Sequence, residues 1–226
     1  MKQRIRNIIG AGLFAMVFSA APLAIAVSST TDSTTDITTT TTTTADDDKV
    51  DTDPVKVKSR LEGLKTSLKI KLTTAEQASL KAKCKAAQTI TAKLNDRFGT
   101  SVTTRTKAYD NLAKHLTDII AKLKDKGVDV TKLQQESTEL QAKIATYKTD
   151  LASYKQALSD VKTIDCVADP AAFKAALQTA RTAHDKLVAD AIAVKTYVKD
   201  TIKPTLEEIR KSLEAQESTN KTEEAQ

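Results

Sequence analysis

Largely apolar residues recur at a fixed spacing along the middle of the chain, and this spacing constrains the fold more than any other feature. Between residues 130 and 163 the steps alternate between four and three without a break. The positions are Leu133, Ser137, Leu140, Ile144, Tyr147, Leu151, Tyr154, Leu158 and Val161. A period of 3.5 residues keeps such a set on one stripe of an α-helix, as in a coiled coil. The pattern predicts a helix that packs along its whole length.

A second stripe precedes this one, between residues 80 and 123. Its steps also alternate between four and three, except for two successive steps of four around Phe98. Such a stutter locally unwinds a coiled coil without ending it. A glycine inside a helix is unfavourable by only about 1 kcal/mol, so we expect the helix to continue through Gly99. With Thr73 and Glu76 as a capping box at its start, the prediction is one helix from about residue 75 to residue 126.

A third stripe runs from Phe173 to Leu213, behind an Asp169-Pro170 pair that suits the start of a helix. Pro204 lies within this stripe and is expected to kink the helix, or to end it with a short further helix beyond. A shorter amphipathic stretch predicts an additional helix near the N-terminus, with its apolar positions at Val57, Leu61, Leu64 and Leu68.

Few residues between 55 and 213 can break a helix. They are Gly63, Gly99, Gly127, Pro170 and Pro204. Short connections around Gly127 and Cys166 make successive helices antiparallel neighbours, and Asp129 is placed to cap the helix that follows the first connection. We therefore expect an all-α fold: an elongated antiparallel three-helix coiled-coil bundle with a short extra N-terminal helix.

The two cysteines test this arrangement. If the chain turns at Gly127, facing residues of the first two long helices have numbers that add up to about 255. Cys166 then lies about a turn and a half from Cys84, a gap that the connecting loop can close. An exported chain would favour a Cys84–Cys166 disulfide. The alternative is a pair of free thiols that pack as small apolar residues.

The N-terminus has the parts of a secretory signal peptide. Lys2, Arg4 and Arg6 precede an apolar run over residues 8–21, and Ala24 and Ala26 complete a small-residue cleavage pattern. We place the cleavage after Ala26, which makes residues 1–26 the signal peptide. The alternative is an uncut membrane anchor, because residues 8–27 are just long enough to span a bilayer.

Three segments follow the signal peptide. Residues 27–54 are rich in Thr and Asp and contain little to bury, so we expect a disordered linker, which glycosylation could turn into a stalk. Residues 55–213 form the helical coiled-coil domain, and residues 214–226 are expected to be a disordered tail. The location predicted for the chain is outside the cytoplasm: periplasmic, cell-surface or secreted.

The sequence carries no motif for a specific chemistry, so we expect no enzyme, no cofactor, no metal site and no small-molecule substrate. The only histidines are His115 and His184, which the helical register places about 15 Å apart, too far to share a metal. His184 is expected to be half-buried beside a neighbour such as Asp150. The tyrosines on the stripes are expected to lie in the core.

Charge is distributed unevenly along a chain whose formal net charge is +6. The first long helix is rich in lysine, and its candidate polyanion-binding residues are Lys81, Lys83, Lys85, Lys122, Lys124 and Lys126. Such a surface could bind nucleic acid or another anionic polymer. The alternative is a solvated helix face, because lysine is also a good helix former and stacking aromatics are scarce here.

The runs KLKDKGVDVTKL and DCVADPAAFKAAL, with the long helices beside them, resemble segments of uncharacterised exported long-helix proteins of ultra-small bacteria. The resemblance covers about residues 75–210 and rests on structural motifs, a capped turn and a cysteine before a capped helix. No activity is established for that group. The resemblance therefore implies the coiled-coil architecture and no function.

Three functions fit these features. The first is an exported structural or interaction protein of the cell envelope, which presents a helical rod to a partner and could form oligomers. The second is a binder of extracellular polyanions that uses the lysine-rich helix. The third is a periplasmic holdase-type chaperone, which would require an oligomer with an exposed apolar cavity.

Overall fold

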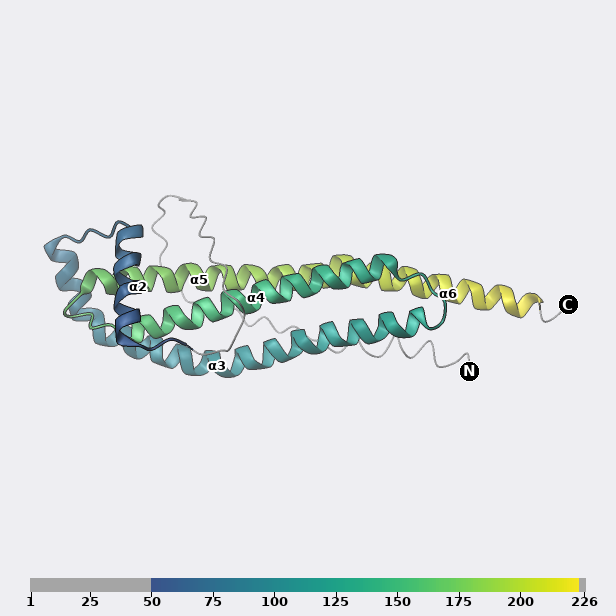
Figure 1. Ribbon diagram of the computed structural model, residues 1–226, viewed down its shortest axis with the longest axis horizontal. Helices are drawn as coiled ribbons and strands as arrows, with labels where there is room; N and C mark the ends of the chain where they lie inside the picture. The colour runs from purple at the N-terminus through teal and green to yellow at the C-terminus, as the bar shows by residue number, and fades with distance from the viewer. Residues whose placement is uncertain (1–49, 224–226) are drawn as a thin grey trace. The chain divides into compact units, whose positions relative to one another are not determined.

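The computed structural model describes residues 50–223, and these residues form helices joined by short connections (Figure 1). The part of the chain that is described contains no strand, which confirms the all-α class. The signal peptide and the linker up to residue 49 lie outside it. The elements are α2 (Pro54–Ser67), α3 (Thr74–Lys124), α4 (Thr131–Thr163), α5 (Pro170–Tyr197), a π-helical segment η1 (Val198–Ile202) and α6 (Lys203–Glu223).

Helix α3 is continuous through Gly99, as the stutter in its apolar stripe predicts. Its start is a capping box. The backbone N–H of Glu76 donates to Thr73 Oγ1 over 3.2 Å, and the N–H of Thr73 donates to Glu76 Oε2 over 2.8 Å. These two bonds satisfy N–H groups that have no partner inside the helix, which fixes where α3 begins.

The turn between α3 and α4 is built around Gly127, whose φ of 74° is in the left-handed region. The Gly127 N–H donates to the carbonyl of Lys124, and the Val128 N–H donates to that of Leu123. This pair of bonds is a Schellman motif, in which a glycine avoids the steric penalty that a side chain would meet.

Asp129 does not occupy the N-cap position that we predicted for it, because α4 begins one residue later, with Val130 as the N-cap. The Asp129 carboxylate instead accepts hydrogen bonds from the backbone N–H of Thr131, over 3.0 Å, and from its hydroxyl, over 2.8 Å. The aspartate thus closes an Asx-type turn that leads into the helix.

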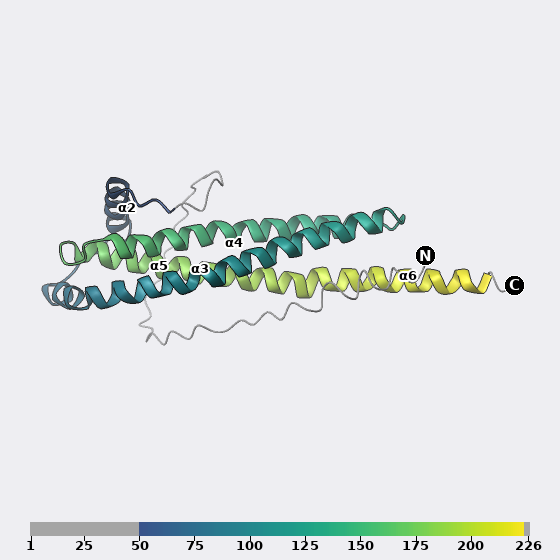
Figure 2. The ribbon, with the colours of Figure 1, turned by 90° about the horizontal axis from the view of Figure 1, so that it is seen from below.

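Aromatic contacts fix the direction and register of neighbouring helices. Between α3 and α4, Phe98 meets Tyr154 and Tyr109 meets Tyr147, with ring centroids 4.8 and 4.9 Å apart. Residue numbers rise on one helix as they fall on the other, so α3 and α4 are antiparallel, in the predicted register. Tyr154 also lies 5.5 Å from the ring of His184 on α5. Figures 1 and 2 show α4 beside α3 and α5.

The third stripe continues through Pro204 without ending. Asp169 caps α5 by accepting a hydrogen bond from the Ala172 N–H, and Pro170 occupies the first turn, as predicted. Before Pro204, the helix widens into the π-helical segment Val198–Ile202, where the Lys203 N–H donates to the carbonyl of Val198. Proline cannot donate to the preceding turn, and a π-helical turn is one way to relieve this defect. Of the two outcomes expected at Pro204, the helix end is not observed, and the irregularity just before the proline is a π-helical segment.

The tail was expected to be disordered from residue 214, but α6 extends to Glu223. The residues after Leu213 include Glu, Ala and Gln, which are good helix formers. Arg210 and Glu214 also lie one turn apart on α6, 4.0 Å from nitrogen to oxygen, and such pairs support a helix. Local propensity is therefore sufficient to continue the helix through this region.

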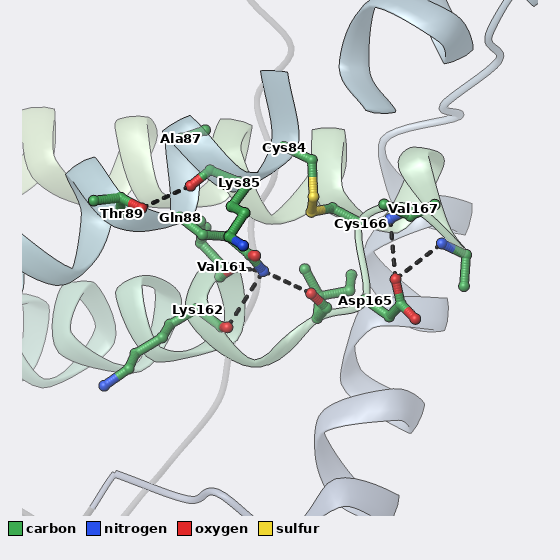
Figure 3. Close-up of a disulfide and its surroundings, with 12 residues drawn as sticks. Cys84, Lys85, Ala87, Gln88, Thr89, Val161, Lys162, Asp165, Cys166 and Val167 are labelled. Carbon is green, nitrogen blue, oxygen red and sulfur yellow. Dashed lines mark hydrogen bonds between the residues drawn. A yellow bond between two sulfur atoms is a disulfide. The ribbon is translucent and has the colours of Figure 1, made fainter. Parts of the chain in front are cut away.

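The two cysteines are joined as a disulfide, in the predicted pairing (Figure 3). Their Cα atoms are 5.8 Å apart, and both side chains are buried. One turn further along α3, the Gln88 amide nitrogen lies 2.7 Å from the carbonyl oxygen of Ile164 and 3.3 Å from those of Val161 and Lys162. The disulfide and Gln88 together hold the end of α4 and the following loop against α3.

We predict that the double substitution Cys84→Ser/Cys166→Ser lowers the free energy of unfolding by about 2–4 kcal/mol, because the disulfide restricts the unfolded chain over a sequence separation of 82 residues. Urea unfolding followed by circular dichroism measures this difference. Reduction of the unsubstituted chain should give a similar loss, and it should have no effect on the variant. Equal unfolding midpoints for the oxidised and reduced chain would contradict the prediction.

Candidate functional site

A network of side-chain hydrogen bonds lies where residues 51–53 lead into α2. The Arg60 guanidinium of α2 binds both carboxylate oxygens of Asp160 on α4, with Nε to Oδ2 at 2.8 Å and Nη2 to Oδ1 at 2.6 Å. Gln156, one turn before Asp160, accepts from the Asp51 backbone N–H over 2.8 Å and donates to the Asp51 carbonyl over 3.0 Å. We call Asp51, Arg60, Gln156 and Asp160 the entry network.

The entry network is a partly buried ion pair with its remaining polar groups satisfied. The Asp160 side chain is only 3% exposed, and Gln156 donates a further hydrogen bond to it over 2.9 Å. The hydrogen bond to Asp160 raises the pKa of Arg60, so the guanidinium stays charged. Residues 51–53 are thus ordered against α4 and α2, which corrects the expectation that the linker is disordered up to residue 54.

A second contact ties α2 to the start of α5. Lys65 Nζ lies 2.8 Å from Asp169 Oδ2, and the other oxygen of this carboxylate caps α5. Burial raises the pKa of Asp169, but the hydrogen bonds from Lys65 and from the Ala172 N–H outweigh it and hold the pKa below its ordinary value. One carboxylate therefore serves both the helix cap and the anchoring of α2.

The six candidate polyanion-binding lysines are all exposed, but they do not form one surface. The first trio (Lys81, Lys83, Lys85) lies near the start of α3 and the second trio (Lys122, Lys124, Lys126) at its end and in the following turn. At 1.5 Å per residue the two trios are about 55 Å apart. Within the first trio, the middle lysine points away from the other two, because residues four apart share a helix face and residues two apart do not.

His184 does not pair with Asp150, the partner expected from the sequence. Its Nδ1 lies 3.2 Å from the carboxylate of the adjacent Asp185, and its ring packs on Tyr154. Asp150 faces Asp190 of α5 instead, and their carboxyl groups lie within hydrogen-bonding reach. Burial, together with this carboxyl neighbour, raises the pKa of Asp190 to about 6.

The stripe pattern does not indicate that Asp190 belongs to a site. The residue lies beside the third stripe, next to the stripe position Ala191, where an acidic residue would be taken as part of the solvated face. Only the approach of α4 brings a second carboxyl group to it.

A further polar cluster joins α4 to the region around η1. Glu136 is buried, 6% exposed, and accepts a 2.7 Å hydrogen bond from the Thr205 hydroxyl, which is also buried. One turn further along α4, Glu139 accepts from the Tyr197 hydroxyl over 2.7 Å. Burial and this carboxylate raise the pKa of Tyr197, which keeps the phenol a hydrogen-bond donor. These bonds fix the register between α4 and the helices on either side of η1.

The tyrosines expected in the core are there. Tyr109 and Tyr147 are each 1% exposed, and Tyr154 is also buried. Within residues 50–223 no helix is both long enough and apolar enough to cross a membrane, and no group of His, Cys, Asp and Glu side chains is arranged to hold a metal.

Comparisons of the chain with protein-family models, with curated proteins and with solved structures found no match.

We predict that Arg60→Met lowers the free energy of unfolding by about 2–3 kcal/mol, because it leaves the buried Asp160 carboxylate with Gln156 as its remaining partner. The control is Lys132→Met, which breaks the Lys132–Glu208 ion pair, whose side chains are 64% and 69% exposed. This control should change stability by at most about 0.5 kcal/mol. Chemical unfolding of both variants measures the difference, and similar losses would show that the entry network adds nothing beyond a surface ion pair.

Proposed function

We propose that the chain is an exported structural or interaction protein of the cell envelope, which presents a helical rod to a protein or envelope partner and performs no catalysis. The entry network is the observation that carries this proposal. A preceding segment can position a helical body only if its end is bound to that body. The hydrogen bonds of Gln156 to Asp51 and the Arg60–Asp160 ion pair bind residue 51 and α2 to α4 in this way.

The proposed body is an elongated antiparallel three-helix coiled coil. The proposal is supported by the antiparallel contacts of α4 with α3 and with α5, and by the burial of its stripe. Leu133, Leu140 and Val161 of that stripe have no exposed surface. A helix buried along its length between two neighbours suits a spacer, because its stiffness comes from packing and not from propensity alone.

The far end of this body offers a single helix for contact. Lys132 Nζ lies 3.2 Å from Glu208 Oε2, which places the start of α4 level with Glu208. From there to Glu223, α6 continues for about 20 Å at 1.5 Å per residue, and both views show it passing beyond the turn that joins α3 to α4 (Figures 1 and 2). We place the partner contact on this part of α6.

Site-specific photocrosslinking in intact cells tests this placement. A photoreactive residue in place of Lys211, which is exposed on α6, should give a discrete adduct. The matched control replaces Lys58, which is exposed on α2 at the linker end, and should give none. Adducts of equal yield from both positions, or from Lys58 alone, would contradict the proposal.

Polyanion binding is a second candidate, and the position of the first trio favours it. Lys81, Lys83 and Lys85 are exposed near the start of α3, and Lys69 and Lys71 are exposed in the connection from α2, so positive charge gathers around this end of the helix. No carboxylate among the described residues forms an ion pair with the trio. Unpaired lysines at this density attract anionic polymers through counterion release.

The two trios provide their own control. Replacement of the first trio by glutamine should weaken binding of the chain to a single-stranded oligonucleotide about tenfold or more at 50 mM salt, whereas the same change in the second trio should have a smaller effect. Gel shifts at 50 and 200 mM salt measure both the affinity and its salt dependence. Equal effects of the two replacements, or no binding by the unsubstituted chain, would contradict the proposal.

A further inference from the structure

Two carboxyl groups face each other between α4 and α5, near the middle of α4 and in the second half of α5. Asp150 extends from α4 and Asp190 from α5, and both are partly buried. Leu151 follows Asp150 on α4, and Leu187 and Val194 lie one turn before and one turn after Asp190 on α5. All three are buried. The pair therefore lies beside buried apolar side chains of both helices.

This pair needs a proton to be stable. Two ionised carboxylates repel each other at hydrogen-bonding distance, and one of them must be protonated for a hydrogen bond to form. The buried Oδ2 of Asp190 has no hydrogen-bond partner among the described residues, so no hydrogen bond there compensates a charge on this oxygen.

The charged and titratable neighbours compensate the charge of the pair only in part. On α5, Lys186 lowers the pKa of Asp190, but its effect is smaller than those of burial and Asp150. On α3, burial raises the pKa of Tyr109 to about 12, so its phenol stays neutral. On α4, burial also raises the pKa of Tyr147, and the nearby Arg105 of α3 partly offsets this.

The direction of the pH effect follows from these shifts. Asp190 has a pKa of about 6 in the folded chain and an ordinary value of 3.8. Between these two values the folded chain keeps a proton that the unfolded chain has lost. The folded state is therefore favoured as the pH falls through 6, and this advantage is lost as the pH rises above it.

We propose that Asp150 and Asp190 form a proton-operated clasp, in which a shared proton holds α5 against α4 and loss of that proton loosens α5 around residue 190. When the clasp is open, the two carboxylates move apart and α5 loosens between Lys186 and Val194. Water then reaches the buried tyrosines of α3 and α4. The clasp adds regulation by pH to the helical body and is independent of the partner contact on α6.

The test is hydrogen exchange and urea unfolding of the full chain between pH 5 and 7.5. The folding equilibrium constant should increase up to about tenfold when the pH falls from 7.5 to 5, as the shift of Asp190 from 3.8 to about 6 implies. Asp190→Asn, which hydrogen-bonds Asp150 without a shared proton, should remove most of this increase. At pH 7.5 it should also slow exchange of the α5 amides around residue 190 relative to the unsubstituted chain.

Asp185→Asn is the matched control, because Asp185 is on the same helix with its side chain 83% exposed and contacts His184. It should retain the pH dependence of the unsubstituted chain. If Asp185→Asn removes the dependence, the titrating group is His184 and the proposal fails. Parallel pH profiles for the unsubstituted chain and Asp190→Asn would overturn it as well.

Discussion

The packing of α4 against two neighbours is the constraint on which the rest of the helical body depends. Its stripe is buried on the sides that face α3 and α5, and three of its residues, Leu133, Leu140 and Val161, are completely buried. Complete burial of a Leu or Val side chain contributes roughly 1.5–3 kcal/mol. Because the stripe extends over the whole of α4, removal of either neighbour would expose it along its full length.

Polar contacts on α4 give this apolar packing its register. A stripe of similar aliphatic side chains tolerates a shift of one heptad, whereas a buried polar group is satisfied only in one alignment. Glu136 meets the Thr205 hydroxyl near the start of α4, and Asp160 meets Arg60 near its end. A shift of either neighbour would leave a buried carboxylate without its partner, an arrangement that is unfavourable by several kcal/mol.

Much of this architecture follows from local features of the sequence. Stripe spacing predicts the long helices, because burial of one face is periodic in sequence. The turn at Gly127 and the starts at Thr73 and Asp169 follow from caps that involve neighbouring residues. The cysteine pairing follows from the register that the turn imposes. Each of these inferences uses residues that are close in sequence, or a single turn to relate two helices.

The features that the sequence did not predict depend on contacts between distant segments. Two contacts of the entry network, Gln156 with Asp51 and Arg60 with Asp160, join segments that are about 100 residues apart in the chain. The heptad spacing of apolar residues carries no information on such a contact. The sequence around Asp190 does not reveal its carboxyl neighbour, because Asp150 reaches it only through the packing of α4 against α5. The π-helical segment depends on packing that keeps the helix intact through Pro204, where local propensity alone would end it.

The distribution of these contacts along α5 determines what a change at Asp190 can do. The loop before α5 is held by the disulfide, and its first turn by Lys65 through Asp169. Its last turn is held by the bond from Tyr197 to Glu139. Repulsion between Asp150 and Asp190 therefore acts on a helix that is fixed at both ends. The part of α5 around Asp190 can bow away from α4 while the ends stay in place, so the effect is a local opening and not a separation of the helices.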